Sequence, residues 1–565
     1  MVHLDDPRVR RSEVPSGEHD AVPALPDERA LPASAALQPD SAGLLPTRLL
    51  ALVVGAVLVL AVVLRFTTRS PLWLDEALTV NISSRPLSQL PHLLSHDGAP
   101  PLYYFLLHFW MKAFGTSDLA TRALAGLCGV VNLPVGWLAA YRVGSRWWAL
   151  EEMDPFEARA LMTRGRIAGW AATLLLASSP FAVYYDTEAR MYGLVLLLGT
   201  LAVLAVTSLL RRPGLSRALL VFLVAAALLY SHYWALYLWG VAGLGSLWFA
   251  WRGPRKEAAR YMVAALTAAG IAFLPWFPTF WFQLHHTGTP WAAPADYTAI
   301  VFTFTQFAGG NSDAGRALAL VLFALALLAL FGAPLRARLV LLDLRTRPGV
   351  RLVTAAVIAT LVVAILAGKI SGSTFADRYT SVVAFPAILV FGYGAATIGD
   401  ARIRQGVLAV AVLFGFAASV PNAMILRTQA GEVAAALNAR ARRGDVVGYC
   451  PDQLGPSVSR LTKAGLQQIT FPRDSAPQIV DWVNYKSVIA RASPWRFAKL
   501  LERRAAGRTI YLVLAPGYQG FGNDCQDIAL DLGRNRHQST VVAAQPSDTP
   551  FEIYEGMTLL RFSPR

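Results

Sequence analysis

The stretch LLALVVGAVLVLAVVL, Leu49–Leu64, contains no charged or polar side chain. An apolar run of about this length predicts a helix that crosses the hydrocarbon core of a membrane. Ten more such runs follow along the chain. They are Leu119–Tyr141, Ile167–Tyr184, Tyr192–Leu210, Ala218–Tyr230, Trp234–Trp251, Tyr261–Phe280, Ala317–Leu335, Leu352–Leu366, Ser381–Ile398 and Gly406–Val420. The sequence therefore predicts a polytopic α-helical membrane protein with about eleven transmembrane helices.

The overall composition agrees with a membrane protein. Of the 565 residues, 55% are hydrophobic and only 15% are charged, which is more apolar than a soluble core needs. The formal net charge of +15 is also typical of nucleic-acid-binding proteins. Here, however, the basic residues form short clusters between apolar runs, so they indicate membrane topology and not a nucleic-acid partner.

The basic clusters predict the orientation in the membrane. Five of them fall on one side if the short aromatic segment Pro101–Phe114 is not counted as a span, as the positive-inside rule requires. They are Arg142–Arg166, Arg211–Arg217, Arg252–Arg260, Arg336–Arg351 and Arg402–Arg404. Pro101–Phe114 is then an outward juxtamembrane helix, with Tyr103, Tyr104, Phe109 and Trp110 at the headgroup boundary. We expect a multi-pass plasma-membrane protein with a cytoplasmic N-terminus and an extracytoplasmic C-terminus.

Three regions follow from this topology. Residues 1–47 are rich in Pro, Ala, Ser and acidic residues and predict a disordered cytoplasmic tail. Residues 48–423 form the transmembrane module, and residues 424–565 form an extracytoplasmic soluble α/β domain with short buried-strand patterns at 446–449 and 510–514. Cys450 and Cys525 both lie in that domain, where an oxidising compartment favours a disulfide over two free thiols.

The first outward loop holds adjacent carboxylates, Asp75 and Glu76, and later His96 and Asp97. Carboxylates beside a span cost desolvation free energy unless they serve a base, an ion or a structural pair. Neighbours on a helix point about 100° apart, so we expect Asp75 to face a site as general base while Glu76 caps, pairs or orients the loop. The alternative is that both simply begin a helix, where acidic side chains favour the macrodipole.

The second outward loop contains Asp186, Glu188, Arg190 and Tyr192. An arginine among tyrosines suits a lipid phosphate, because the guanidinium offers paired donors and keeps its charge. The alternative is an interfacial helix cap with tyrosine anchors.

Two further outward turns supply candidates for binding a phosphate or a lipid. Lys369, Arg378 and Tyr379 place two cations against the positive-inside trend, which suggests an anion, although snorkelling to headgroups explains Lys369 equally well. The pair His232 and Tyr233 is more typical of an interfacial aromatic belt than of a catalyst.

The long loop Gln283–Arg316 includes Trp291 and a glycine pair, and its length suits a mobile lid. No ligand spacing in this loop makes a metal site convincing. A divalent metal ion could assist through Asp75 or Glu76, but the sequence requires no cofactor.

Taken in order, five motifs resemble a known family. They are Asp75-Glu76, Pro100-Pro101-Leu102-Tyr103-Tyr104, Glu188-Ala189-Arg190-Met191-Tyr192, His232-Tyr233 and Arg378-Tyr379. Over Pro71–Val420 the chain resembles the protein O-mannosyltransferase and aminoarabinose-transferase superfamily of membrane glycosyltransferases with the GT-C fold. The resemblance implies a polyprenyl-phosphate-linked sugar as donor, transfer on the extracytoplasmic face and inversion at the anomeric carbon. It also implies that Asp75 is the base and that Arg190 and Arg378 bind the donor phosphate.

The residues are compatible with that chemistry, because a sugar leaving a phosphate needs a carboxylate on one face and fixed cations on the other. The acceptor could be a cell-envelope glycan, a lipid or a protein hydroxyl. A transporter or flippase for a lipid-linked sugar is the main alternative, but its ionisable residues belong near the midplane, whereas here they gather at the outer edge. A membrane-anchored receptor leaves the outward acidic and arginine motifs unexplained.

Overall fold

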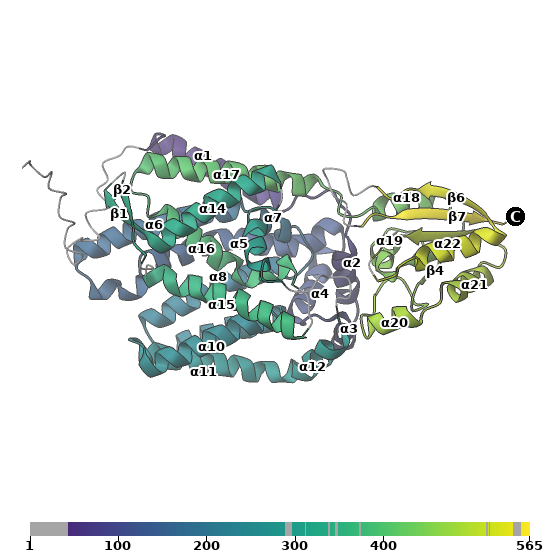
Figure 1. Ribbon diagram of the computed structural model, residues 1–565, viewed down its shortest axis with the longest axis horizontal. Coiled ribbons are helices and arrows are strands. Elements are labelled where there is room, and N and C mark those ends of the chain that lie inside the picture. The colour runs from purple at the N-terminus through teal and green to yellow at the C-terminus, as the bar shows by residue number, and fades with distance from the viewer. Residues whose placement is uncertain are drawn as a thin grey trace, which may run out of the picture.

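The computed structural model consists of a long helical bundle with an α/β domain at one end (Figure 1). The residues described are 43–288, 296–310, 312–336, 339–344, 348–371, 375–515, 518, 520–545 and 555–564. Residues 1–42 of the predicted tail, Trp291 of the predicted lid and residues 372–374 beside Arg378 lie outside the described ranges.

The bundle is built from helices on which all eleven predicted spans fall. They are α1 (Thr47–Leu64), α5 (Asp118–Gly144), α6 (Pro155–Ala177), α7 (Pro180–Asp186), α8 (Tyr192–Arg211), α9 (Leu215–Ser231), α10 (Ala235–Arg252), α11 (Lys256–Phe273), α12 (Phe277–His286), α14 (Asp313–Phe331), α15 (Pro348–Ser371), α16 (Ser381–Ala395) and α17 (Ala401–Met424). In the described part of the chain, seven helical segments are long and apolar enough to cross a membrane, or eight if one bent pair counts as a single span. The predicted multi-pass class is confirmed, with fewer full-length apolar spans than eleven.

The predicted span Ile167–Tyr184 is not one straight helix. Helix α6 ends at Ala177, and α7 continues after a bend of 57°. The bend has a local cause, since the Ser179 hydroxyl caps α7 by accepting the N–H of Ala182, and Pro180 occupies the first turn. Sequence periodicity missed this break because both halves are apolar. The bend directs α7 into the loop that carries Arg190.

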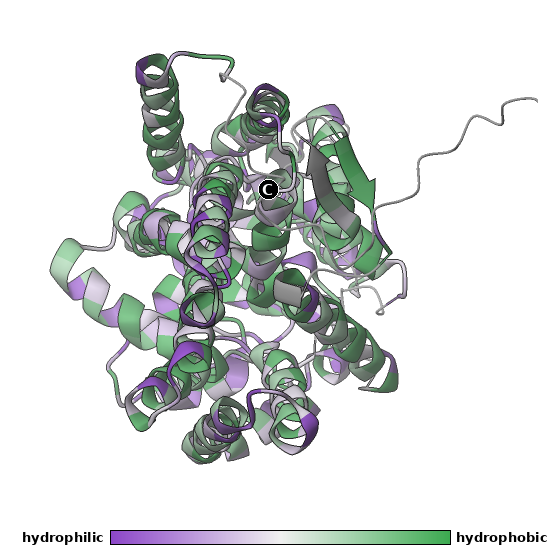
Figure 2. Ribbon diagram, turned by 90° about the vertical axis from the view of Figure 1, so that its left-hand side faces the viewer, coloured by the Kyte–Doolittle hydropathy of each residue, from purple (hydrophilic) through white to green (hydrophobic). Residues whose placement is uncertain are grey.

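The outside of the bundle is apolar, as a lipid contact requires. Figure 2 looks along the bundle and shows that hydrophobic residues make up much of its helices. Leu52, Leu244 and Leu320 are 71%, 72% and 72% exposed. In contrast, α16 is buried on nearly every side and forms the centre of the bundle between α6, α8 and α14. The chain is therefore a multi-pass membrane protein.

Three of the predicted basic clusters meet at the end of the bundle away from the α/β domain. Glu151 pairs with Arg211 at 2.6 Å and with Arg212 at 3.1 Å, and Glu152 pairs with Arg255 at 3.1 Å. The same end carries a two-stranded hairpin of β1 (Gly332–Arg336) and β2 (Leu339–Leu342). The predicted span Ala317–Leu335 therefore ends earlier than expected, at Phe331.

The opposite end carries three short helices, α2 (Leu74–Ser83), α3 (Leu90–Asp97) and α4 (Leu102–Phe114), which lie between the bundle and the α/β domain (Figure 1). Helix α4 is the predicted juxtamembrane helix. Phe109 is 54% exposed, but Tyr103 and Tyr104 are only 1% exposed. Placing these two tyrosines at the headgroup boundary was wrong, because their face of α4 packs inward against α2.

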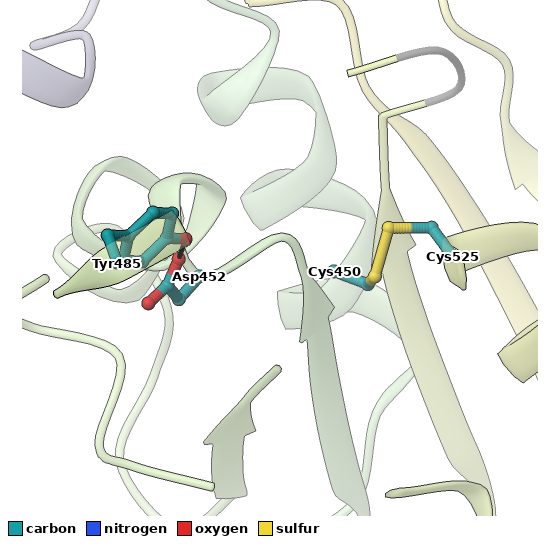
Figure 3. Close-up of a disulfide and its surroundings, with 4 residues drawn as sticks. All are labelled: Cys450, Asp452, Tyr485 and Cys525. Carbon is teal, nitrogen blue, oxygen red and sulfur yellow. Dashed lines mark hydrogen bonds between the residues drawn. A yellow bond between two sulfur atoms is a disulfide. The ribbon is translucent and has the colours of Figure 1, made fainter. Parts of the chain in front are cut away.

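The C-terminal domain has a five-stranded mixed sheet in the order β4 (Gln467–Thr470), β3 (Val446–Cys450), β5 (Ile510–Leu514), β7 (Thr558–Ser563) and β6 (His537–Val542). The strands β4, β3 and β5 are parallel, β7 runs antiparallel to β5, and the edge strand β6 runs antiparallel to β7 and so in the same direction as the other three. Its helices are α18 (Ala430–Arg440), α19 (Gly455–Ser459), α20 (Tyr485–Arg491), α21 (Pro494–Ala505) and α22 (Asp524–Asn535). The predicted α/β domain is confirmed, and so is the disulfide between Cys450 and Cys525 (Figure 3).

Candidate active site

The first turn of α2 carries two adjacent carboxylates with different surroundings. Glu76 is fully buried, and the Arg122 guanidinium donates to its two oxygens at 2.6 and 2.5 Å. The backbone N–H of Ala189 donates to the same carboxylate at 2.9 Å. Burial alone would raise the pKa of Glu76, but Arg122 holds it below its ordinary value. Glu76 thus joins α2 to α5 and to the second loop, as expected of an orienting residue.

Asp75 points to a different side of the same turn. Its Oδ2 lies 3.7 Å from Nη2 of Arg378, and the two side chains keep 18% and 28% of their surface exposed. Consecutive helical residues diverge by about 100°, so burying Glu76 leaves the Asp75 carboxylate accessible. The positive end of the α2 dipole also favours a negative charge at this position. A reachable carboxylate and a reachable guanidinium therefore lie together.

Arg190 lies beside this pair and is held by the first outer segment. Its Nη1 donates to Thr79 Oγ1 at 2.7 Å and lies 3.5 Å from the backbone oxygen of Asp75. The same nitrogen lies 3.4 Å from the Tyr104 hydroxyl, which donates to Asp97 Oδ2 at 2.5 Å. Burial raises the pKa of Asp97, against the positive charge of Arg190. Asp97 therefore anchors Arg190 through Tyr104.

Three donors in this group are buried and have no hydrogen-bond partner among the described residues: Nε of Arg190, Nε of Arg378 and the hydroxyl of Tyr192. An unsatisfied buried donor costs free energy unless a ligand or water accepts from it. They belong to one group: the Arg190 guanidinium lies 5.9 Å from the centroid of the Tyr192 ring, and both arginines lie beside Asp75, Arg190 at its backbone oxygen and Arg378 at its carboxylate. The arrangement is suited to an oxyanion, which accepts from several donors at once.

A row of aromatic rings closes the side of this group. The ring centroids of Tyr192 and His232 are 5.9 Å apart, and those of His232 and Tyr379 are 5.3 Å apart. His232 Nδ1 accepts the backbone N–H of Trp234 at 3.1 Å. Burial, with the charges of Arg190 and Arg378, lowers the pKa of His232 to about 3. His232 is therefore a neutral wall residue at physiological pH.

Behind Asp75, Glu188 forms a second buried acidic position. Its Oε1 accepts from Trp73 Nε1 at 3.2 Å and lies 3.8 Å from Nη1 of Arg427. Burial raises the pKa of Glu188 to about 7, although Arg427 opposes the shift. Glu188 thus joins its own loop to Trp73 and Arg427. In the described part of the chain it forms no hydrogen bond with Arg378 or Arg190.

Four predicted candidates lie outside the group around Asp75. Asp186 is buried with Arg65 at 2.8 Å, inside the bundle. Tyr233 donates to Gln283, and Lys369 is exposed with its Nζ 4.0 Å from the Tyr297 ring. His96 Nδ1 lies 3.0 Å from Asp481 of the α/β domain.

The structure also brings in residues that sequence reasoning missed. Arg122 falls inside the predicted span Leu119–Tyr141, and a lone charge in an apolar run was the signal that could have found it. Arg427 and Glu555 come from the linker and the α/β domain, far from the outward loops in sequence. No pattern in the sequence marks these two.

Metal binding was predicted to use Asp75 and Glu76 if it occurs at all. Both Glu76 oxygens accept from protein donors. Over the described ranges, no group of three or more His, Cys, Asp or Glu side chains is placed to hold a metal ion. Asp75 is thus the one of the two carboxylates that is open to an external group.

Comparison with known proteins places the whole arrangement in a structural context. No protein-family model and no curated protein sequence matches the chain. Solved structures do match it. ArnT from Cupriavidus metallidurans bound to undecaprenyl phosphate superposes with a TM-score of 0.53 at 13% sequence identity, over 91% of this chain and 98% of ArnT. The apo form of that protein gives a TM-score of 0.55 over the same shares.

A second match is the arabinofuranosyltransferase AftD from Mycobacteria, with a TM-score of 0.50 at 14% identity. The match covers 94% of this chain but only 41% of AftD. Identities this low establish the fold alone. The chain therefore has the predicted GT-C fold, shared with ArnT and AftD: a multi-pass helical membrane module with an α/β domain at one end.

Proposed function

We propose that this protein transfers a hexosyl or pentosyl group from a polyprenyl-phosphate donor to an acceptor hydroxyl on the extracytoplasmic face of the cell membrane. The observation that carries the proposal is the accessible Asp75 carboxylate beside Arg378 and Arg190, whose Nε atoms are buried and have no partner among the residues that the structure describes. In such a transfer the acceptor hydroxyl loses a proton and the leaving phosphate gains negative charge. A carboxylate can accept the proton, and two guanidinium groups can stabilise the phosphate. The fold shared with ArnT supports the same class.

In the proposed reaction the acceptor oxygen attacks the anomeric carbon from the side opposite the phosphate. The bond from the anomeric carbon to the phosphate oxygen breaks, and the phosphate leaves with the electron pair. The proton of the acceptor hydroxyl moves to Asp75. Arg122 and Ala189 occupy the Glu76 carboxylate, so Asp75 is the accessible carboxylate of this pair, and we propose that it acts as a base in a single displacement with inversion.

The donor phosphate would lie against Arg378 and Arg190, with the Tyr192 hydroxyl as a third donor. A guanidinium keeps its charge and can give two parallel hydrogen bonds to phosphate oxygens. The ArnT structure contains undecaprenyl phosphate, which supports a polyprenyl phosphate as the lipid carrier here. The neutral His232 and the rings of Tyr192 and Tyr379 would pack against the sugar or the first lipid units.

The acceptor belongs to one of three classes: a cell-envelope glycan, a lipid or a protein hydroxyl. The α/β domain is the element that we propose to bind it, because this domain covers the end of the bundle where Asp75 lies (Figure 1). The proposed topology has the N-terminus in the cytoplasm and the α/β domain outside, in agreement with the basic ion-pair cluster at the opposite end.

The test is transfer of radiolabelled sugar by the purified protein in nanodiscs, with membrane extract as the acceptor pool. Polyprenyl-phosphate sugars and nucleotide sugars are compared as donors. Labelled product from the lipid-linked donors alone supports the proposal and identifies the acceptor. Transfer from nucleotide sugars would overturn the choice of donor. Movement of lipid-linked sugar across proteoliposomes without transfer would indicate a flippase.

A further inference from the structure

The α/β domain places one buried carboxyl group against the loop that carries Asp75. Glu555 lies just before β7 and is 8% exposed. Its Oε1 accepts the backbone N–H of Leu74 at 2.5 Å, and its Oε2 lies 3.5 Å from the Ser457 hydroxyl. Leu74 is the first residue of α2 and directly precedes Asp75. A side chain of the α/β domain, 481 positions from Leu74 in the sequence, thus reaches the first turn of the helix.

The hydrogen bond from Leu74 to Glu555 caps the N-terminus of α2. The first N–H groups of a helix have no partner within the helix, and a side chain normally caps them. Here the side chain of the N-cap residue, Trp73, has no oxygen or ring nitrogen that could accept, while Glu76 accepts the Trp73 N–H weakly, at 3.4 Å. Glu555 therefore supplies from another domain the cap that the local sequence lacks.

Two backbone hydrogen bonds hold Glu555 in place, which limits where its side chain can lie. The backbone N–H of Glu555 donates to the backbone oxygen of Arg427 at 3.1 Å. The backbone oxygen of Glu555 accepts the backbone N–H of Gln429, also at 3.1 Å. Arg427 is itself held on both outer loops. Its N–H donates to Ser70 Oγ at 2.9 Å, and its Nη2 donates to Thr187 Oγ1 at 2.7 Å.

We infer that Glu555 is a positioning residue: by capping α2 at Leu74 from the α/β domain, it fixes Asp75 relative to Arg378 and Arg190. The inference rests on the proposed function, since it assigns the α/β domain a part in assembling the same site. Burial, with the charge of Asp75 in the same direction, raises the pKa of Glu555 to about 8, despite hydrogen bonds from Thr428 and Leu74. A neutral carboxyl is the form that sits beside Asp75 without repelling it.

This protonation state suggests a matched pair of variants. Glu555→Gln keeps an oxygen for the Leu74 N–H and resembles a neutral carboxyl, whereas Glu555→Ala removes the cap. The first readout needs no activity: hydrogen exchange of the peptide covering Leu72–Leu78 in the full-length protein in nanodiscs. We expect roughly tenfold faster exchange at Leu74 in Glu555→Ala and wild-type exchange in Glu555→Gln. Equal exchange in wild type and Glu555→Ala would overturn the inference.

The second readout separates positioning from a structural role. We expect kcat for sugar transfer to fall roughly tenfold or more in Glu555→Ala, with the KM for the lipid-linked donor nearly unchanged, and to recover in Glu555→Gln. An unchanged kcat in Glu555→Ala, or an equal loss in both variants, would overturn the positioning role. If the wild type transfers no sugar, the proposed function fails, while the exchange experiment still decides whether Glu555 caps α2.

Discussion

Arg378 Nη2 and Asp75 Oδ2 lie 3.7 Å apart, a separation longer than a direct hydrogen bond. Both side chains are partly exposed, in contrast to the tight, buried pair of Glu76 and Arg122. The Asp75 pair attracts electrostatically, but each partner keeps hydrogen-bonding capacity for a third group. A ligand phosphate can take the guanidinium while a hydroxyl takes the carboxylate.

Replacing Asp75 with Asn should abolish the base and leave the fold intact. Asn cannot accept a proton, so we expect kcat to fall about a hundredfold or more, within the range typical for loss of a general base. The donor KM should change little, because the phosphate contacts come from Arg378 and Arg190. Steady-state transfer assays over a range of donor concentrations measure both values. Wild-type turnover in the variant would remove Asp75 from the proton transfer.

The two outward cations predicted from sequence should behave differently. Arg378→Lys keeps the charge but loses the planar donor pair, so we expect the affinity for polyprenyl phosphate to fall about tenfold or more. Lys369→Ala should leave it unchanged, because Lys369 is exposed and its Nζ lies over the Tyr297 ring. Calorimetric titration with polyprenyl phosphate measures both. Equal losses would mean that Lys369 also reaches the phosphate.

The sequence predicted the membrane module, the α/β domain and the disulfide because each has a local signal. Apolar runs, strand patterns and cysteine positions can all be found without knowing what packs against what. The different surroundings of Asp75, which is partly exposed, and Glu76, which is buried, also follow from helix geometry. The bend after Ala177 was missed, since a break between two apolar helices leaves the hydrophobic pattern unchanged.

The rest of the group around Asp75 depends on contacts between distant segments. Arg122, Arg427 and Glu555 reach the first outer loop only after the bundle and the α/β domain have packed together. Tyr233 illustrates the opposite error: it is adjacent to His232 in sequence, but the turn points it towards Gln283. Neighbours in sequence share a loop, and the packing decides which of them share a site.

Glu76 should be a stability residue. Glu76→Gln leaves the buried Arg122 guanidinium without its counter-charge, and breaking a buried ion pair typically costs about 3–5 kcal/mol. We expect a clearly lower apparent Tm of the detergent-solubilised protein, whereas Asp75→Asn should stay close to wild type. Thermal unfolding followed by tryptophan fluorescence compares the two. Matching Tm values would show that the Glu76–Arg122 pair does not hold the outer loop.

The disulfide should stabilise the α/β domain. Cys450 and Cys525 are separated by 75 residues, and in the loop-closure account the entropy lost by the unfolded chain when a loop of that length is closed raises its free energy by about 4 kcal/mol. We expect the double variant Cys450→Ser with Cys525→Ser to exchange the β3 and β5 amides much faster than wild type. Unaltered exchange in these strands would contradict a stabilising role. The free thiol Cys128 lies in α5 and should not affect this measurement.

The pH dependence of the α/β domain should be set in part by Asp452, which follows β3 next to the disulfide (Figure 3). Asp452 is 2% exposed, and Tyr485 donates a hydrogen bond to it. Burial raises the pKa of Asp452 from 3.8 to about 7. Between these values the folded domain holds a proton that the unfolded chain releases. The free energy of unfolding therefore falls as the pH rises from about 4 to about 7.

Asp452→Asn removes this dependence, because Asn cannot ionise but still accepts from the Tyr485 hydroxyl. At pH 8 we expect the variant to be more stable than wild type by an amount on the order of 3 kcal/mol, and at pH 4 the two should be alike. Hydrogen exchange of the β3 and β5 amides in the full-length protein, corrected for intrinsic rates, measures the difference at each pH. Parallel pH profiles for the two proteins would mean that Asp452 is already ionised in the folded domain, and that Tyr485 stabilises a carboxylate there.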